Sequence, residues 1–308
     1  MAGPLWLLIG QSSWPANPGK FDVTRNAAAS IAAHLAYCAI GADERERKNR
    51  AKVIPCEVYQ RLVTEEFDFI DALRSMDFAD VEVVSTKFFV AVVISLPHFL
   101  LIGVRGTQFA YDWAINAKVI KAKDDSGAYF HSGFLREARE LAAALRTRLH
   151  GRFAKMTARQ GLAIYLAGHS LGGAVAAILS QMQFAAPINE CYMFGAPRVS
   201  NASRFSSLNQ PFATRRYLDA VPHCPPGSLN YVDFSDQKTT DGSRYEPASR
   251  LEMYFFSSWL IGMALSQFPE NHSMEHYRFE VVENARKDPR IQQLWRSDWP
   301  DFRPRTSR

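Results

Sequence analysis

Apolar residues along this chain follow two different spacings. Residues 23–40 and 132–153 repeat apolar positions every three or four residues, which predicts two helices with a buried face. Residues 88–95 and 99–104 are instead continuous apolar runs separated by a proline-containing turn. Such runs predict two buried strands that pair through that turn.

The middle of the chain alternates strand and helix. Residues 162–167 predict a short buried strand that turns sharply at Gly168, and residues 171–182 predict a helix buried on most sides. Further strands are predicted at residues 190–194 and 212–218, and further helices at residues 55–76 and 272–286. This alternation is typical of an α/β fold with a mostly parallel central sheet and helices covering both faces.

No linker, internal repeat or low-complexity segment interrupts the pattern. We therefore expect a single domain over residues 1–308, with an N-terminal helical portion at residues 1–80 that packs on a core at residues 81–290. The 308 residues are 47% hydrophobic and 22% charged, which suits a globular protein and argues against disorder.

Composition also narrows the partners and cofactors. The net charge of +5 is modest, and much of the basic excess is interleaved with acidic residues, so we expect a solvated face and no nucleic-acid partner. The four cysteines lie far apart, at Cys38, Cys56, Cys191 and Cys224. Because no pair has metal-ligand or redox spacing, we expect neither a zinc site nor a thioredoxin-like redox pair. We also expect no other metal and no organic cofactor.

Two apolar stretches bear on location. Residues 1–10 are apolar but lack a basic leader, so they make a poor signal peptide, which favours the cytoplasm by default with secretion as the alternative. Residues 253–265 form the longest apolar run, too short to cross a bilayer, so no membrane span is predicted.

The stretch Gly168-His169-Ser170-Leu171-Gly172 carries the chemistry. A serine between two such glycines, after a predicted strand and before a predicted helix, is typical of a nucleophile elbow. The small neighbours let the turn close, and the helix N-terminus lies under the serine oxygen. We therefore predict Ser170 to be the nucleophile of a serine hydrolase.

With this elbow in place, the sequence resembles the class 3 lipase family of fungal triacylglycerol lipases, over roughly residues 88–277. The matching stretches occur in the family's order: Val104-Arg105-Gly106-Thr107, Asp112-Trp113 with Asn116, His131-Ser132-Gly133-Phe134, the elbow itself, Phe194-Gly195-Ala196-Pro197-Arg198-Val199, Asp219-Ala220-Val221-Pro222, and His272-Ser273 with Tyr277. The resemblance implies an α/β-hydrolase fold with a short helical lid.

The resemblance also implies roles. Ser170 would attack the ester carbonyl, His272 would transfer the proton, and Asp219 would orient His272. This order of serine, acid and histidine is that of α/β-hydrolases. The backbone amides of Thr107 and Leu171 would form the oxyanion hole.

Some alternatives stay open for the acid and the base. Asp233 and Asp236 lie in a polar loop after Asp219 and could replace it, and His276 lies one helical turn beyond His272. His169 adjoins the nucleophile, but its side chain is expected to pack and point away from it.

Residues between Thr107 and His131 suggest the lid. An aromatic-rich segment containing Trp113 is followed by polar sequence, which is typical of a short helix that opens at a lipid surface. The alternative is a fixed helix that shapes the pocket. Asn116 replaces an aspartate common in the family and can still accept a hydrogen bond from Thr107. The apolar run at residues 253–265 is interpreted as a helix lining an acyl pocket or contacting lipid, with a plain core helix as the alternative, and its Trp259 is predicted to contact substrate.

The sequence therefore predicts hydrolysis of carboxylic esters with apolar acyl chains through an acyl-enzyme. A triacylglycerol or related lipid is the expected substrate, with transient binding at a lipid interface. Phospholipase A1 and feruloyl esterase are alternatives that use the same three residues. A lipid-binding protein without catalysis is the remote alternative.

Overall fold

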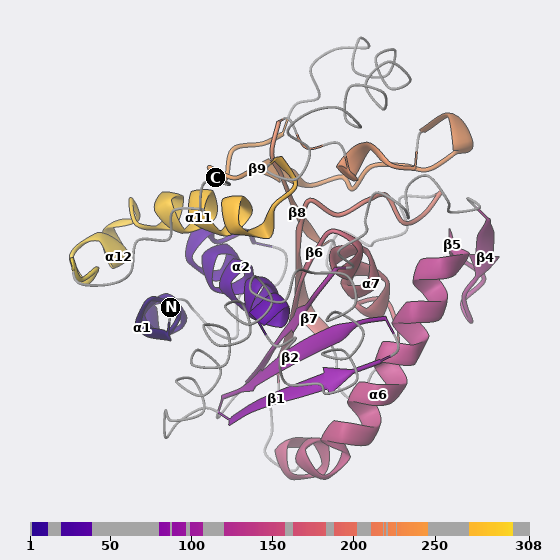
Figure 1. Ribbon diagram of the computed structural model, residues 1–308, viewed down its shortest axis with the longest axis horizontal. Helices are drawn as coiled ribbons and strands as arrows, with labels where there is room; N and C mark the ends of the chain where they lie inside the picture. The colour runs from indigo at the N-terminus through magenta and orange to yellow at the C-terminus, as the bar shows by residue number, and fades with distance from the viewer. Residues whose placement is uncertain are drawn as a thin grey trace, which may run out of the picture.

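A seven-stranded sheet forms the centre of the protein (Figure 1). The computed structural model describes residues 2–11, 20–38, 80–86, 88–96, 99–106, 120–157, 163–182, 188–201, 211–217, 219, 221–225, 227–245 and 271–297. In spatial order, the strands are β1 (Asp80–Ser85), β2 (Val90–Ser95), β3 (Phe99–Val104), β6 (Ala163–His169), β7 (Ile188–Phe194), β8 (Phe212–Arg215) and β9 (Gln237–Thr239).

The sheet is mixed and mostly parallel. β1, β2 and β3 pair in antiparallel fashion, whereas β3, β6, β7, β8 and β9 are parallel neighbours. The register pairs Val104 with Gly168 and His169 with Phe194, so the carboxyl ends of three strands lie at the same edge. Residues that follow these strands therefore start out as neighbours, as in other α/β sheets.

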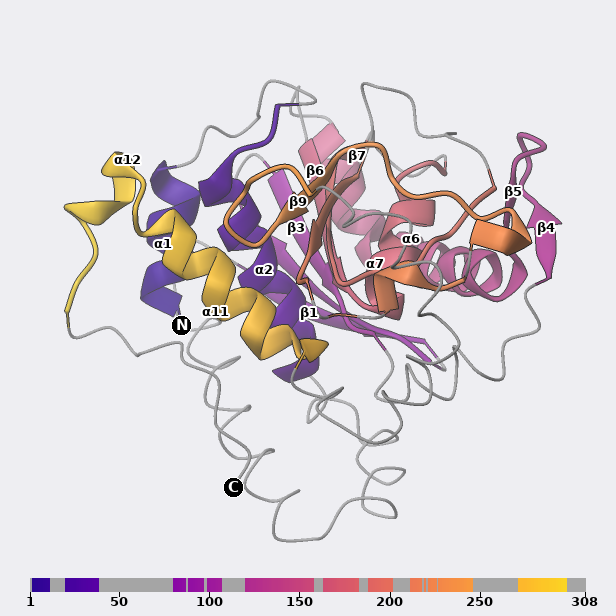
Figure 2. The same cartoon turned by 90° about the horizontal axis from the view of Figure 1, so that it is seen from above.

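Helices cover both faces of this sheet (Figure 2). One face carries α1 (Ala2–Gln11), α2 (Val23–Cys38) and α11 (Met274–Ala285), and the other carries α6 (Ser132–Thr157) and α7 (Leu171–Leu179). Strand β2 shows the division, because alternate side chains point to opposite faces of a strand. Val92 packs with the first set of helices, and Val93 packs with the second.

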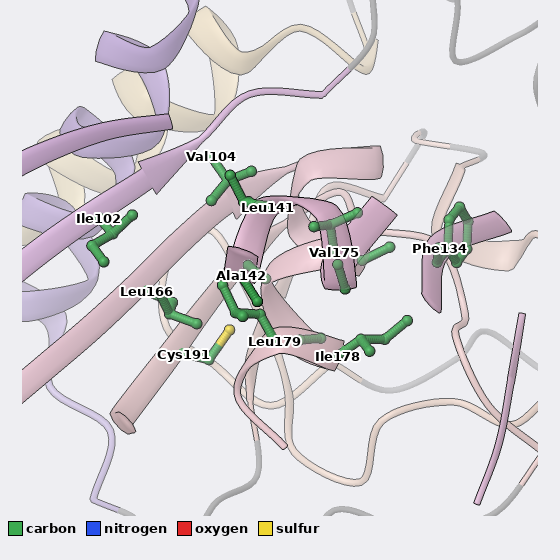
Figure 3. Packing of buried hydrophobic residues seen from close by; sticks show 14 of the residues in the cluster. Ile102, Val104, Phe134, Leu141, Ala142, Leu166, Val175, Ile178, Leu179 and Cys191 are labelled. Carbon is green, nitrogen blue, oxygen red and sulfur yellow. The ribbon is translucent and has the colours of Figure 1, made fainter. Parts of the chain in front are cut away.

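The core behind the elbow lies between α6, α7 and the sheet (Figure 3). Leu141 and Ala142 of α6, Ile178 and Leu179 of α7, and Cys191 of β7 belong to this one buried cluster. Every residue of α7 is buried. This explains why the segment is apolar all round, and it confirms the expectation of a helix buried on most sides.

The predicted α/β architecture and most predicted elements are confirmed, with shifted ends. β6 continues through Gly168 and His169 before the chain turns, α7 ends at Leu179, and β8 ends at Arg215. Helix α11 begins at Met274, because Ser273 accepts a hydrogen bond from the Glu275 backbone as its N-cap. The predicted helix at residues 55–76 and the apolar run at residues 253–265 lie outside the described residues.

Several short elements have no counterpart in the prediction. They are helix α1, strands β1 and β9, the hairpin of β4 (Lys121–Lys123) and β5 (Tyr129–His131), and the short helix α12 (Pro289–Gln292). None of the helices in the described ranges is long and apolar enough to cross a membrane.

Candidate active site

Ser170 lies at a sharp turn between β6 and α7. Its backbone has φ 55° and ψ −129°, in the left-handed range that a serine rarely adopts. The turn closes so tightly that a Cβ on Gly168 would lie 2.4 Å from the carbonyl oxygen of Gly172. A Cβ on Gly172 would in turn lie 2.5 Å from the carbonyl oxygen of Val104. Glycine is therefore required at both positions for the elbow to form against the end of β3.

The surrounding backbone holds this turn in place. The Ser170 amide donates to the Phe194 carbonyl at 2.9 Å, and the Ser170 carbonyl accepts from the Gly173 and Ala174 amides in the first turn of α7. Strain of this kind persists only where the neighbouring structure fixes it. The serine is only 1% exposed, and its Oγ makes no hydrogen bond within the described part of the chain. The hydroxyl is thus left for another partner.

Asp219 and His272 meet although 53 residues separate them in sequence. His272 Nδ1 lies 2.8 Å from Asp219 Oδ2 and 3.0 Å from Oδ1, and both side chains are buried. Because an ionised carboxylate only accepts hydrogen bonds, Nδ1 carries the proton and Nε2 becomes the basic nitrogen. Asp219 follows β8 at the carboxyl edge of the sheet, and His272 lies just before α11.

His272 also lies beside the elbow. Its ring stacks on the ring of His169, the residue before Ser170, with centroids 4.6 Å apart and planes inclined by 32°. The structure therefore brings the predicted base to the predicted nucleophile's turn, with the predicted acid behind it.

Two further groups hold the Asp219 carboxylate. The Tyr277 hydroxyl donates to Oδ2 at 2.6 Å, and the Val221 amide donates to Oδ1 at 3.0 Å. Burial, followed by the Asp219 charge, keeps the pKa of Tyr277 well above its ordinary value, so this hydroxyl stays a donor. Tyr277 belonged to a motif, but its contact with Asp219 was not predicted, because no local pattern links the two residues.

Gly195 makes room for this carboxylate. It has φ +57°, and a Cβ at this position would lie 2.6 Å from Asp219 Oδ2 and 3.0 Å from the Tyr277 hydroxyl. Any larger residue would both strain the backbone and push against the acid.

The alternative acids lie in other interactions. Asp233 accepts hydrogen bonds from Arg198 at 2.8 and 3.0 Å and from Arg215 at 2.6 Å. Although burial alone would raise it, these two arginines lower the pKa of Asp233 to about 2. Asp236 pairs with Lys238 at 3.0 Å. Asp233 thus joins the ends of β7 and β8 to the loop that follows Asp219.

The structure also distinguishes the predicted base from the other histidines. The ring of His272 bonds Asp219, as predicted for the base. His223 lies in the short 3-10 helix η2 (Val221–His223), and burial lowers its pKa to about 4. Burial also lowers the pKa of His131 to about 4.

The predicted oxyanion and lid residues are only partly described. Leu171 is the first residue of α7 and is buried against the sheet. Thr107, Trp113, Asn116 and Trp259 lie outside the described residues. The segment leading to Thr107 is described as far as Gly106, where a Cβ would lie 3.0 Å from the Ser170 Cβ. In the described ranges, no three His, Cys, Asp or Glu side chains gather as ligands for a metal ion.

Comparison with known proteins finds similarity to lipases in sequence and in fold. Residues 101–229 match the family model for lipase (class 3). The chain is 28% identical over 151 residues to the secreted mono- and diacylglycerol lipase 1 of Fusarium solani, covering 46% of this chain and 44% of that protein. It thus aligns with less than half the length of this curated relative.

Solved fungal lipases share the fold. One fungal lipase structure matches with a TM-score of 0.53 at 16% identity, covering 84% of this chain and 96% of that one. A fungal lipase–inhibitor complex, described as a model for interfacial activation, matches with a TM-score of 0.52 at 19% identity, covering 81% and 95%. Over residues 101–229 this chain is thus similar to the class 3 lipases, and its fold is similar to that of solved fungal lipases.

Proposed function

We propose that this protein hydrolyses carboxylic esters of apolar acyl chains through an acyl-enzyme. Ser170 is the nucleophile, His272 the base and Asp219 the residue that orients the base. The observation that supports this most directly is the pairing of a buried Asp219–His272 hydrogen bond with a strained, unbonded serine at the neighbouring elbow. Strain at such a position is typical of a functional site.

The first half-reaction forms the acyl-enzyme. Ser170 Oγ attacks the carbonyl carbon while its proton passes to His272 Nε2, and the carbonyl oxygen becomes an oxyanion. Asp219, held by Tyr277, keeps His272 in the reactive tautomer and stabilises the imidazolium that forms. His272 then gives the proton to the leaving alcohol, and the ester bond breaks.

The second half-reaction restores the serine. Water attacks the acyl carbonyl, its proton passes to His272 Nε2, and collapse of the second oxyanion releases the fatty acid while Ser170 Oγ regains the proton. The amides of Thr107 and Leu171 are proposed to stabilise both oxyanions, where each donor contributes about 10²–10³ in rate. The position of Leu171 at the N-terminus of α7 supports its part in this role.

Mono- and diacylglycerols are the proposed first substrates, since the curated relative is a mono- and diacylglycerol lipase. We further propose that the segment with Trp113 and Asn116 is a lid, and that Trp259 contacts the acyl chain. An opening lid exposes apolar surface, which costs about 25 cal/mol per Å² in water and is favoured at a lipid interface.

The test is a rate profile over glycerol and p-nitrophenyl esters of rising acyl length, below and above their solubility limits. Phospholipids and feruloyl esters serve as competing substrates, and Ser170→Ala is the control. A sharp rise above the solubility limit that Trp113→Ala reduces supports a lipase with a lid. A smooth rate curve through the solubility limit, with Trp113→Ala lowering the rates on short and long esters equally, would indicate an esterase in which this segment is a fixed pocket wall. No hydrolysis by the wild type would contradict the proposed function.

A further inference from the structure

His169 lies directly behind the proposed base. Its ring is buried and stacks on His272 with centroids 4.6 Å apart. The centroid of its ring also lies 5.7 Å from that of Tyr277, whose hydroxyl donates a hydrogen bond to Asp219. One side chain, adjacent to Ser170 in sequence, therefore contacts both His272 and the tyrosine that bonds Asp219.

Tyr37 fixes the orientation of this ring. The Tyr37 hydroxyl lies 2.6 Å from His169 Nδ1, and the two rings are 5.7 Å apart at 60°. Burial keeps the pKa of His169 low, so the ring is neutral and takes part in this hydrogen bond through Nδ1. The bond to Tyr37 therefore fixes the direction of the ring.

Helix α2 holds Tyr37 firmly at this depth. At Gly103 of β3, an added Cβ would lie 1.9 Å from the Ala32 carbonyl oxygen, so the helix packs directly on the strand. His34 of the same helix bonds Arg278 of α11 at 2.7 Å. The helix is therefore tied both to the sheet that carries Ser170 and to the helix that follows His272.

The charge state of His169 suits a supporting role. Burial, followed by the neighbouring His272 charge, holds the pKa of His169 well below its ordinary value. A protonated ring at this distance would oppose the imidazolium that forms on His272, whereas a neutral ring does not.

We propose that His169, oriented by Tyr37, is a positioning residue that supports the His272 ring in line with Ser170 and Asp219. The inference rests on the proposed function only for its kinetic consequence. Its structural content, a restrained His272 ring, is independent of the substrate. A ring displaced by about 1 Å can lose about 10²-fold in rate, so support of this kind has a measurable effect.

The experiment compares His169→Ala, His169→Phe and Tyr37→Phe with the wild type at temperatures where all are folded. Two quantities are measured: kcat and KM on a soluble short-chain ester, and the downfield proton resonance of the His272 Nδ1–H bonded to Asp219. The matched control is His131→Ala, because His131 is also buried and packs its ring on Phe134 at 4.4 Å.

The proposal predicts that His169→Ala lowers kcat by about 10²-fold with KM unchanged and broadens the downfield resonance. His169→Phe, which keeps a ring at that position, should restore most of both, and Tyr37→Phe should give an intermediate loss. His131→Ala should lower the melting temperature alone. A His169→Ala variant with wild-type kcat and resonance would overturn the proposal, as would an equal loss in His131→Ala.

Two other outcomes are also decisive. If the wild type hydrolyses no ester, the proposed function fails, and the resonance in the His169 variants still decides whether the ring is restrained. If His169→Ala does not fold, Tyr37→Phe decides, because it removes only one hydroxyl. An unchanged kcat and resonance in that variant would overturn the role of Tyr37.

Discussion

The Tyr277 hydroxyl donates a 2.6 Å hydrogen bond to Oδ2 of Asp219, the same oxygen that lies 2.8 Å from His272 Nδ1. The same tyrosine oxygen accepts a hydrogen bond from the Arg216 amide at 3.1 Å. Tyr277 thus links the backbone after β8 to the carboxylate, and it holds the carboxylate that bonds His272.

Replacing Tyr277 with phenylalanine removes this link and little else. We expect a loss of about 1–3 kcal/mol in the free energy of unfolding. If about 1.4 kcal/mol of this loss also raises the activation free energy of the reaction, kcat falls about tenfold with KM unchanged. Denaturant titration and steady-state kinetics measure the two effects. Tyr231→Phe is the control, since the buried Tyr231 hydroxyl makes no hydrogen bond in the described part of the chain; an equal effect of both would argue against a role for Tyr277.

Asp219→Asn and Asp233→Asn separate the two candidate acids. The asparagine at position 219 favours the wrong imidazole tautomer, so kcat should fall by about 10⁴ with the fold retained. Asp233 lies between Arg198 and Arg215, so its replacement should lower stability and spare most activity. Kinetics on both purified variants decide, and a reversal of the two results would relocate the acid to Asp233.

The interaction of Asp233 with these arginines should also appear as a pH dependence of stability. Its folded-state pKa near 2 lies below the ordinary value of 3.8. The ionised carboxylate therefore stabilises the fold above about pH 4, and this contribution is lost as the pH falls through about 2. The difference in unfolding free energy between wild type and Asp233→Asn should shrink over that window; a difference independent of pH would show that the charge contributes nothing.

Gly195→Ala tests the space around the acid. The new Cβ would lie 2.6 Å from Asp219 Oδ2, in a backbone conformation with positive φ. We expect a loss of about 1 kcal/mol or more in stability and a fall in kcat from a displaced carboxylate. Gly227→Ala is the matched control, because nothing lies within 4 Å of its Cβ position. Equal kcat values for both variants would mean that the carboxylate tolerates displacement.

The regular elements could be predicted from two apolar patterns. In helices α2 and α6 apolar residues follow the helical period, and strands β2 and β3 are continuous apolar runs that are buried on both faces. Strand β9 could not, since its three residues are all polar and it pairs with β8 at the end of the sheet. Strand β1, with Val81 and Val84 buried, carries a weak apolar signal that the prediction overlooked.

For the candidate site, local motifs and chain order were enough to select Ser170, Asp219 and His272. They were not enough for the groups that support these residues. Tyr37 lies 132 positions from His169, and Tyr277 lies 58 from Asp219, so only the folded chain brings them together. Helix α11 begins at Met274 and not at residue 272 as predicted, because Ser273 is its N-cap. His272 therefore lies in the turn before the helix, where its side chain bonds Asp219.

The central claim is that Ser170 is a nucleophile activated by His272. The most direct measurement is labelling of the wild type with a fluorophosphonate, followed by peptide mass spectrometry and by the same reaction on His272→Ala. The account predicts one adduct, on Ser170, formed much more slowly in the histidine variant. An adduct on any other residue, no adduct at all, or an equal labelling rate in His272→Ala would contradict it.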